Sequence, residues 1–169
     1  SDTVQLIHIQ GPGIHSITGT IFSFCGINPY WYINDNNKLP DNWDPSLIYI
    51  ESDSNSINNF NQVSFKHPKT GSKQVWELCP TRPIRIEGDC SLSFTGRNNE
   101  DFYNSSCYSK GSFFWLGTKR DVFINNCNFQ ECISTINQCH AIWITEESEG
   151  NVTIDNCNFL DCGKNSHGY

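Results

Sequence analysis

Several features are missing from this sequence, and each absence narrows the classes of protein to which it can belong. The 169 residues contain no methionine and begin with serine, which indicates a processed or excised chain. Only 11 Lys and Arg stand against 18 Asp and Glu, and they form no basic stripe. Because nucleic acids and anionic membranes attract clustered positive charge, we expect neither as a partner. No apolar run approaches the about 20 residues of a membrane-spanning helix, so none is predicted.

Motifs for catalysis and for metal binding are also missing. The five histidines form no HxxxH or HxH pair, and there is no Gly-rich phosphate loop or GxSxG elbow. An acidic cluster at Glu146, Glu147 and Glu149 lies in a turn and is typical of a solvated, charged loop. We therefore expect no metal, no cofactor and no catalytic residue.

Cysteine, in contrast, is abundant. The nine cysteines include no CxxC pair of the kind that zinc modules use, which favours disulfides in an oxidising compartment over reduced buried thiols. Because nine is odd, at least one sulfur is free or pairs with a segment outside this sequence. Asn104 and Asn151 each begin an Asn-x-Ser/Thr acceptor tripeptide, so a secretory route with glycosylation at both positions is expected.

An internal repeat is the most specific signal in the sequence. DVFINNCNFQEC at 121–132 matches NVTIDNCNFLDC at 151–162. The residues identical to their counterparts 30 positions later are Ile124, Asn126, Cys127, Asn128, Phe129 and Cys132. Before each unit stands a related string, SFFWLG around Trp115 and HAIWIT around Trp143, spaced by 28 residues. A period of about 30 residues with turns of variable length indicates a stacked solenoid.

The local period identifies the kind of solenoid. Val122 and Ile124 alternate with Asp121 and Phe123, which is the period of two that strands show, and no helical period is present. If each unit forms one coil of short strands, equivalent residues of neighbouring coils lie about 4.8 Å apart. Four side chains are then predicted to stack inside the coil, in parallel, on their counterparts: Val122 on Val152, Ile124 on Ile154, Cys127 on Cys157, and Phe129 on Phe159.

The two parts of the chain differ in regularity. Residues 1–110 carry strand-like alternation without a clean repeat, so we expect an irregular N-terminal capping segment with degenerate first coils. Residues 111–169 form the regular coils and stop where the next strand is due. We therefore expect the same chain to continue or another subunit to stack axially on this end.

The repeat residues resemble a known family. They are similar to the repeats of polymorphic outer-membrane-protein-type surface proteins of chlamydiae and some parasitic protists, which carry FxxN and GGAI motifs. The FxxN places are held by Phe129-Gln-Glu-Cys132 and Phe159-Leu-Asp-Cys162, and the GGAI place by Cys139-His-Ala-Ile142. The resemblance covers about residues 111–169. It implies an all-β, right-handed parallel β-helix and a surface-displayed adhesive or coat protein.

Stacking brings the cysteines of neighbouring coils within disulfide range. Cys127 with Cys157 and Cys132 with Cys162 are each geometrically permitted as disulfides. The alternative is an interior ladder of free thiols, packed as small hydrophobic groups. Cys107 and Cys139 precede the SFFW and HAIW strands, and they can pair with each other.

Surface contacts are the expected mode of action. If Ile142 and Ile144 face inward, alternation turns Trp143 outward beside Trp115, forming an apolar strip for sugar rings or a neighbouring protein. The alternative is the opposite strand phase, or an N-terminal loop that covers both rings.

Three functions remain open. The first is an extracellular or cell-surface structural or adhesive protein in a coat or fibre, with a protein or glycan as its partner. The second is a carbohydrate-active β-helix enzyme, pectate-lyase-like or glycoside-hydrolase-like. The third, a disulfide-rich β-sandwich binding module, requires the repeat to be coincidental.

Overall fold

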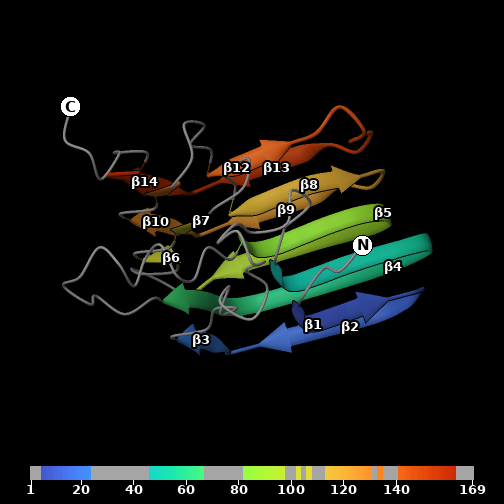
Figure 1. Ribbon diagram of the computed structural model, residues 1–169, viewed down its shortest axis with the longest axis horizontal. Helices are drawn as coiled ribbons and strands as arrows, with labels where there is room; N and C mark the ends of the chain where they lie inside the picture. Colours follow the sequence, from blue (N-terminus) through green and yellow to red (C-terminus); the bar gives the residue numbers. More distant parts are fainter. Residues whose placement is uncertain are drawn as a thin grey trace, which may run out of the picture.

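The protein is all-β in a computed structural model, and its strands are stacked in parallel (Figure 1). The structure describes residues 5–23, 46–66, 82–97, 102–103, 106–107, 113–130, 133–134 and 141–162. The strands are β1 (Gln5–Gln10), β2 (Gly13–Thr18), β3 (Ile21–Ser23), β4 (Ser46–Lys66), β5 (Arg82–Gly96), β6 (Phe102–Tyr103), β7 (Ser106–Cys107), β8 (Phe114–Thr118), β9 (Val122–Asn125), β10 (Asn128–Gln130), β11 (Ile133–Ser134), β12 (Ile142–Ile144), β13 (Val152–Asp155) and β14 (Asn158–Leu160). Within these ranges there is no helix, and hence no helical membrane span.

The strands form layers that follow the order of the chain (Figure 1). One column of register partners runs through all of them, from Ile7 to Ile48, Ile84, Phe114 and Ile142. The spacing between successive partners falls from 41 residues to 36, 30 and 28. Within the described ranges the first layer does not pair with the last, so the hydrogen-bonded ladder stays open. The N-terminal strands therefore belong to the same stack as the sequence repeat.

The predicted register of the sequence repeat is confirmed. β9 pairs with β13 in parallel, with Val122 opposite Val152 and Ile124 opposite Ile154. β10 pairs with β14 in the same way, with Phe129 opposite Phe159. Identical residues therefore occupy the same position on neighbouring strands, as the 30-residue period indicates.

Alternation along the strands separates the core from the surface. On β9, Val122 and Ile124 are completely buried, whereas Phe123 between them is 49% exposed. The buried faces bring aromatic rings together: the ring centroids of Phe114 and Phe94 are 5.2 Å apart, and those of Phe114 and Phe129 are 6.2 Å apart. Because Phe114 lies on β8 and Phe129 on β10, these two strands share one core.

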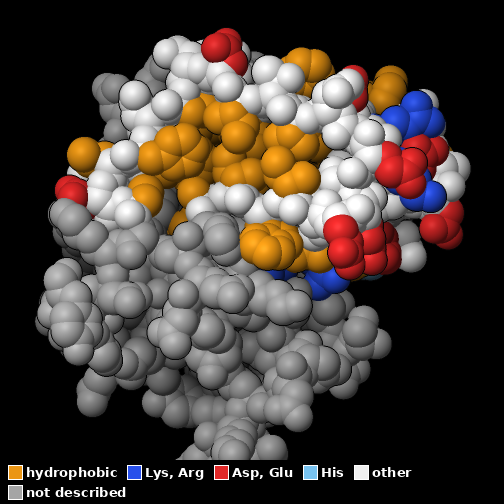
Figure 2. Space-filling view, turned by 90° about the horizontal axis from the view of Figure 1, so that it is seen from above, with side chains coloured by type: hydrophobic (Ala, Val, Ile, Leu, Met, Phe, Trp, Pro, Cys, Tyr) orange, Lys and Arg blue, Asp and Glu red, His pale blue; other side chains and the backbone are white. Residues whose placement is uncertain are grey.

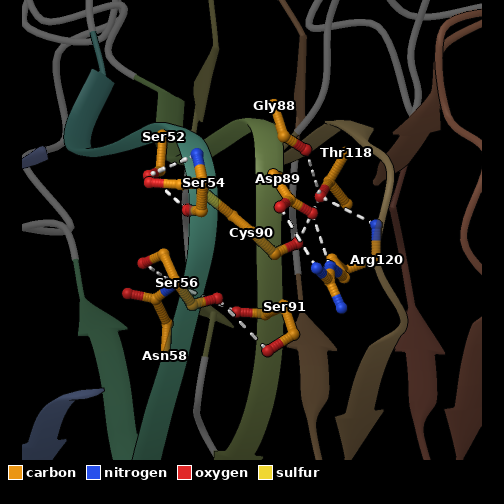
Figure 3. A network of polar contacts seen from close by, with 10 residues as sticks. All are labelled: Ser52, Ser54, Ser56, Asn58, Gly88, Asp89, Cys90, Ser91, Thr118 and Arg120. Atoms are coloured by element: carbon orange, nitrogen blue, oxygen red, sulfur yellow. Dashed lines mark hydrogen bonds and ion pairs between the residues drawn. The ribbon is translucent and has the colours of Figure 1, made fainter. Parts of the chain in front are cut away.

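Hydrogen bonds hold the bend at which β4 and β5 change direction (Figure 3). Gly88 has a φ of 76°, and a Cβ there would lie 2.3 Å from the Ser52 carbonyl oxygen, so only glycine fits. The hydroxyl of Thr118, on the next layer, lies within hydrogen-bond distance of the carbonyl oxygens of Gly88 and Cys90 and donates to one of them at a time. The Arg120 guanidinium pairs with Asp89. Three successive layers are thus tied together at one corner.

The last layer is packed on one side only. Phe159 stacks on Phe129 with ring centroids 4.6 Å apart and planes inclined by 4°. It is nevertheless 49% exposed, while Phe129 is completely buried. Phe159 therefore occupies the predicted column without being enclosed, because no further described strand covers it.

Candidate functional site

A strip of polar and aromatic side chains runs across the layers on the outward side of β1, β4, β5, β8 and β12. We call it the outward strip. Its first row consists of the register partners His8, Tyr49, Arg85, Trp115 and Trp143. Its second row, two residues further along each strand, consists of Gln10, Glu51, Glu87, Gly117 and Thr145.

Strand alternation places these side chains. Tyr49 lies between Ile48 and Ile50, both of which are completely buried. Arg85 lies in the same way between the buried residues at 84 and 86. Since successive side chains on a strand point to opposite faces, the residue between two core residues must face outward. The register then aligns these outward residues in a row.

Tyr49 connects the first three layers of the strip. Its ring stacks on His8 with centroids 5.2 Å apart, and the His8 Nε2 lies 2.9 Å from the Glu51 Oε1. The Tyr49 hydroxyl lies 2.9 Å from the Glu51 Oε2 and 2.5 Å from the Glu87 Oε2. Because a phenol has a single proton, it donates to one of these carboxylates at a time.

The environment of Tyr49 opposes its ionisation. Partial burial raises the pKa of the phenol far above its usual value, and the hydrogen bonds to Glu87 and Glu51 raise it further. A phenolate here would lose both bonds and stand beside two negative charges. Tyr49 is therefore a neutral donor within the strip.

Arg85 connects the Glu87 carboxylate to the indole of Trp115. It donates from Nε, at 3.0 Å, and from Nη2, at 2.5 Å, to the Glu87 Oε1. Its Cζ lies 4.5 Å from the ring centroid of Trp115 and 5.4 Å from that of Tyr49. The guanidinium thus combines an ion pair with cation–π contacts, which fixes its plane between two aromatic side chains.

Glycine allows Trp115 to lie close to the strand. A Cβ at Gly117 would lie 2.7 Å from the Trp115 Cζ3 and 3.3 Å from the Thr145 Oγ1. Trp143 is in register with Trp115 on the next layer, and both are partly buried. The two tryptophans are thus neighbours on the outward row, and neither is completely exposed nor completely covered.

The repeat pattern pointed to the two tryptophans but not to the rest of the strip. The signal is present as a short motif in which an outward residue stands between two core residues. It occurs as IHIQ at 7–10, IYIE at 48–51, IRIE at 84–87, FWLG at 114–117 and IWIT at 142–145. Its spacing changes at every layer, so a search for a fixed period does not detect it.

The expected disulfides need correction. Among the described residues Cys90, Cys127, Cys157 and Cys162 form no disulfide, so Cys127 and Cys157 are not bonded to each other. The thiols point to backbone carbonyls instead: the Cys127 Sγ lies 3.3 Å from the Asn125 oxygen. Their stacked positions would allow a disulfide. The thiols instead donate to backbone carbonyl oxygens and pack as small hydrophobic groups, so no disulfide is needed. Of the two interpretations, the thiol ladder describes this column.

The remaining predicted sites are only partly described. Asn151 is exposed, and its Nδ2 lies 3.2 Å from the Asp121 Oδ1. Asn104, Cys132, Cys139 and the side chain of Cys107 lie outside the described residues. In the part of the chain that the structure describes, no three His, Cys, Asp or Glu side chains are placed to hold a metal ion.

The two rows of the strip together offer a neutral phenol donor, two carboxylate acceptors, a guanidinium plane and two indoles. Such a strip can stack on flat apolar faces and exchange hydrogen bonds with hydroxyl groups. Comparisons with protein-family models, with curated proteins and with solved structures found no match to this chain.

Proposed function

We propose that this chain is part of a right-handed parallel β-helix that acts as a non-catalytic, adhesive protein at an extracellular or cell surface. The outward strip is its binding surface, and the partner is a glycan. The observation that carries the proposal is that the strip continues in register over every layer, from His8 to Trp143.

The coil is supported by the packing of each layer. Register partners recur at spacings of 27 to 30 residues in the C-terminal layers, and every strand pair in the described residues is parallel. Parallel strands that follow one another in the chain need a crossover connection. The contact between Phe114 on β8 and Phe129 on β10 indicates that strands of one turn surround a common core. A right-handed sense is the usual hand of such connections.

The chemistry of the strip favours glycans. Indole rings cover the apolar faces of sugars, while the Glu51 and Glu87 carboxylates and the Tyr49 hydroxyl suit sugar hydroxyls. Mutual contacts hold Tyr49, Arg85 and Trp115 in place, so little side-chain entropy is lost on binding. The negative charges of the Glu51 and Glu87 carboxylates would repel a polyanionic glycan.

A glycan array with the purified chain tests this function. We expect a neutral glycan to bind, and Trp143→Ala to weaken the binding by about tenfold or more, as loss of an aromatic anchor does. Phe123→Ala is the matched control, because Phe123 is also an outward aromatic side chain but lies on β9, away from the strip. The proposal would be contradicted if no glycan on the array bound the chain, or if Trp143→Ala and Phe123→Ala weakened glycan binding equally.

The enzymatic alternative rests on Glu51 and Glu87, whose carboxylates approach the same Tyr49 hydroxyl. Retaining glycosidases place two carboxyl groups about 5–5.5 Å apart, and the shared contact with the Tyr49 hydroxyl keeps the Glu51 and Glu87 carboxylates near each other. Glu87→Gln distinguishes the two functions. Loss of glycan cleavage with binding retained would assign an enzyme, whereas binding without cleavage in both proteins supports adhesion.

A further inference from the structure

The end of the stack formed by β12, β13 and β14 is an open section through the core. Ile144, Ile154 and Phe159 are 49%, 45% and 49% exposed. Their register partners one layer below, Leu116, Ile124 and Phe129, are completely buried. Figure 2, which views this end, shows the hydrophobic side chains gathered in one patch, with both acidic and basic side chains at its right-hand border.

The backbone of this layer is also open. β8, β9 and β10 each pair with a strand on both sides, whereas β12, β13 and β14 pair on one side only within the described residues. Edge strands present unpaired N–H and C=O groups that accept another parallel strand. An occupant of this end must therefore be a β layer with apolar side chains in the same columns.

The first layer of the same chain meets this requirement. Within the described part of the chain, β1, β2 and β3 pair only with β4, so no described strand occupies their other edges. Their columns are those of the last layer: β1 lies in the column of β12, β2 in that of β13, and β3 in that of β14. The inward apolar side chains of β1 and β2, Ile7, Ile9 and Ile17, are only partly buried, and His15 on β2 faces the same way. Phe22 on β3 is already buried, so β1 and β2 carry most of the contact.

Charge favours the first layer of another copy, rather than its last layer, as the occupant of this end. Residues 141–162 carry five acidic side chains and no Lys, Arg or His. Residues 5–23 carry two histidines and no acidic side chain. Two last layers placed face to face would bring like charges together, whereas a last layer against a first layer would not.

We propose that the β12–β14 end binds the β1–β3 end of a second copy of this chain, head to tail. β1 of the second copy then pairs with β12 and β2 with β13, and the core columns continue from one molecule into the next. Because this contact uses two different surfaces and does not close on itself, it generates linear fibres.

Light scattering and electron microscopy of the purified chain test the proposal at concentrations up to about 1 mM. We expect the mean mass to rise with concentration and the particles to be one molecule wide. Ile154→Lys, which alters only the last layer, should raise the concentration needed for assembly by about tenfold or more. Phe123→Lys is the matched control, since Phe123 has similar exposure on an inner layer, and it should leave assembly unchanged.

A mixing experiment fixes the direction of the contact. Ile9→Lys blocks the first layer, with Ile17→Lys as a second choice if the former does not fold by circular dichroism. At a concentration where the wild type has just assembled, each blocked variant alone should stay monomeric, while a mixture of Ile154→Lys and Ile9→Lys should stop at heterodimers. A wild-type chain that is monomeric throughout, a first-layer variant that still dimerises, or equal loss in Phe123→Lys would overturn the proposal.

Discussion

Two asparagines show why certain residues are identical in the repeat. Asn126 and Asn156 occupy the same register position and have φ values of 53° and 47°, in the left-handed region. The Asn156 Nδ2 also donates to the Asn126 Oδ1. Asparagine tolerates this backbone conformation better than other non-glycine residues, and its amide both donates and accepts. The turn conformation and the side-chain ladder therefore both require it.

Substitution of Asn126 separates these two requirements. We expect Asn126→Ala to lower the free energy of unfolding by about 1–2 kcal/mol, since alanine is strained at positive φ. Asn126→Gly removes the same side-chain bond without that strain, and its loss should stay below about 1 kcal/mol. Urea unfolding of the three proteins measures both values. If the two variants lost equal stability, the backbone conformation would not be the reason for asparagine.

Tyr49 predicts a dependence of stability on alkaline pH. Burial first, and then the hydrogen bonds to Glu87 and Glu51, raise the pKa of its phenol in the folded state above the usual value near 10. A raised pKa contributes stability that is complete below the unfolded pKa and is lost as the pH rises above it. We expect the advantage of the wild type over Tyr49→Phe to be constant at neutral pH and to shrink above about pH 10.

Urea unfolding of both proteins over this pH range provides the measurement. Because the other five tyrosines and the lysines are common to both proteins, the difference between the curves reports Tyr49 alone. Phenolate absorbance should show one tyrosine that ionises only when the wild type unfolds. Parallel stability curves for the two proteins would show that Tyr49 does not carry this effect.

At the scale of the strands, the sequence predicted the parts with a constant spacing. Identical residues 30 positions apart specified the parallel register of β9 with β13 and of β10 with β14. Residues 1–110 were expected to contain degenerate first coils, but their register was not predicted, because 41 and 36 residues separate the register partners of the first layers. The contacts of the strip were also inaccessible. The contacts between layers join residues 38 and 43 positions apart, Tyr49 with Glu87 and His8 with Glu51, and no fixed period relates these positions.

The layers offer a matched test of burial within one column. Ile124 on β9 is completely buried, and Ile154, its register partner on β13, is 45% exposed. We expect Ile124→Ala to cost about 2–5 kcal/mol, because it leaves a cavity in the core. Ile154→Ala should cost much less, since the open end already exposes this side chain. Thermal or urea unfolding of dilute protein compares the two, and equal costs would mean that the last layer is covered in solution.

For the whole molecule, the stack makes stability a property of neighbouring layers. Each strand in the described residues pairs only with the layers before and after it. In the coil that we propose, stability is then the sum of the layers and the interfaces between them, as in other quasi-one-dimensional proteins. An inner layer is stabilised by interfaces with two neighbouring layers, whereas an end layer is stabilised by one. Opening should therefore begin at the ends and proceed inward.

Hydrogen exchange measured by mass spectrometry tests this order. We expect the slowest exchange in β5, β8 and β9, whose strands are paired on both sides and whose core side chains are completely buried. The fastest exchange should occur in β12, β13 and β14, where the core is open on one side and opening exposes little additional apolar surface. The experiment is run on dilute protein so that end-to-end contacts do not protect the last layer. Uniform protection across all layers would mean that the chain unfolds as a single cooperative unit, in which the exposed end costs no local stability.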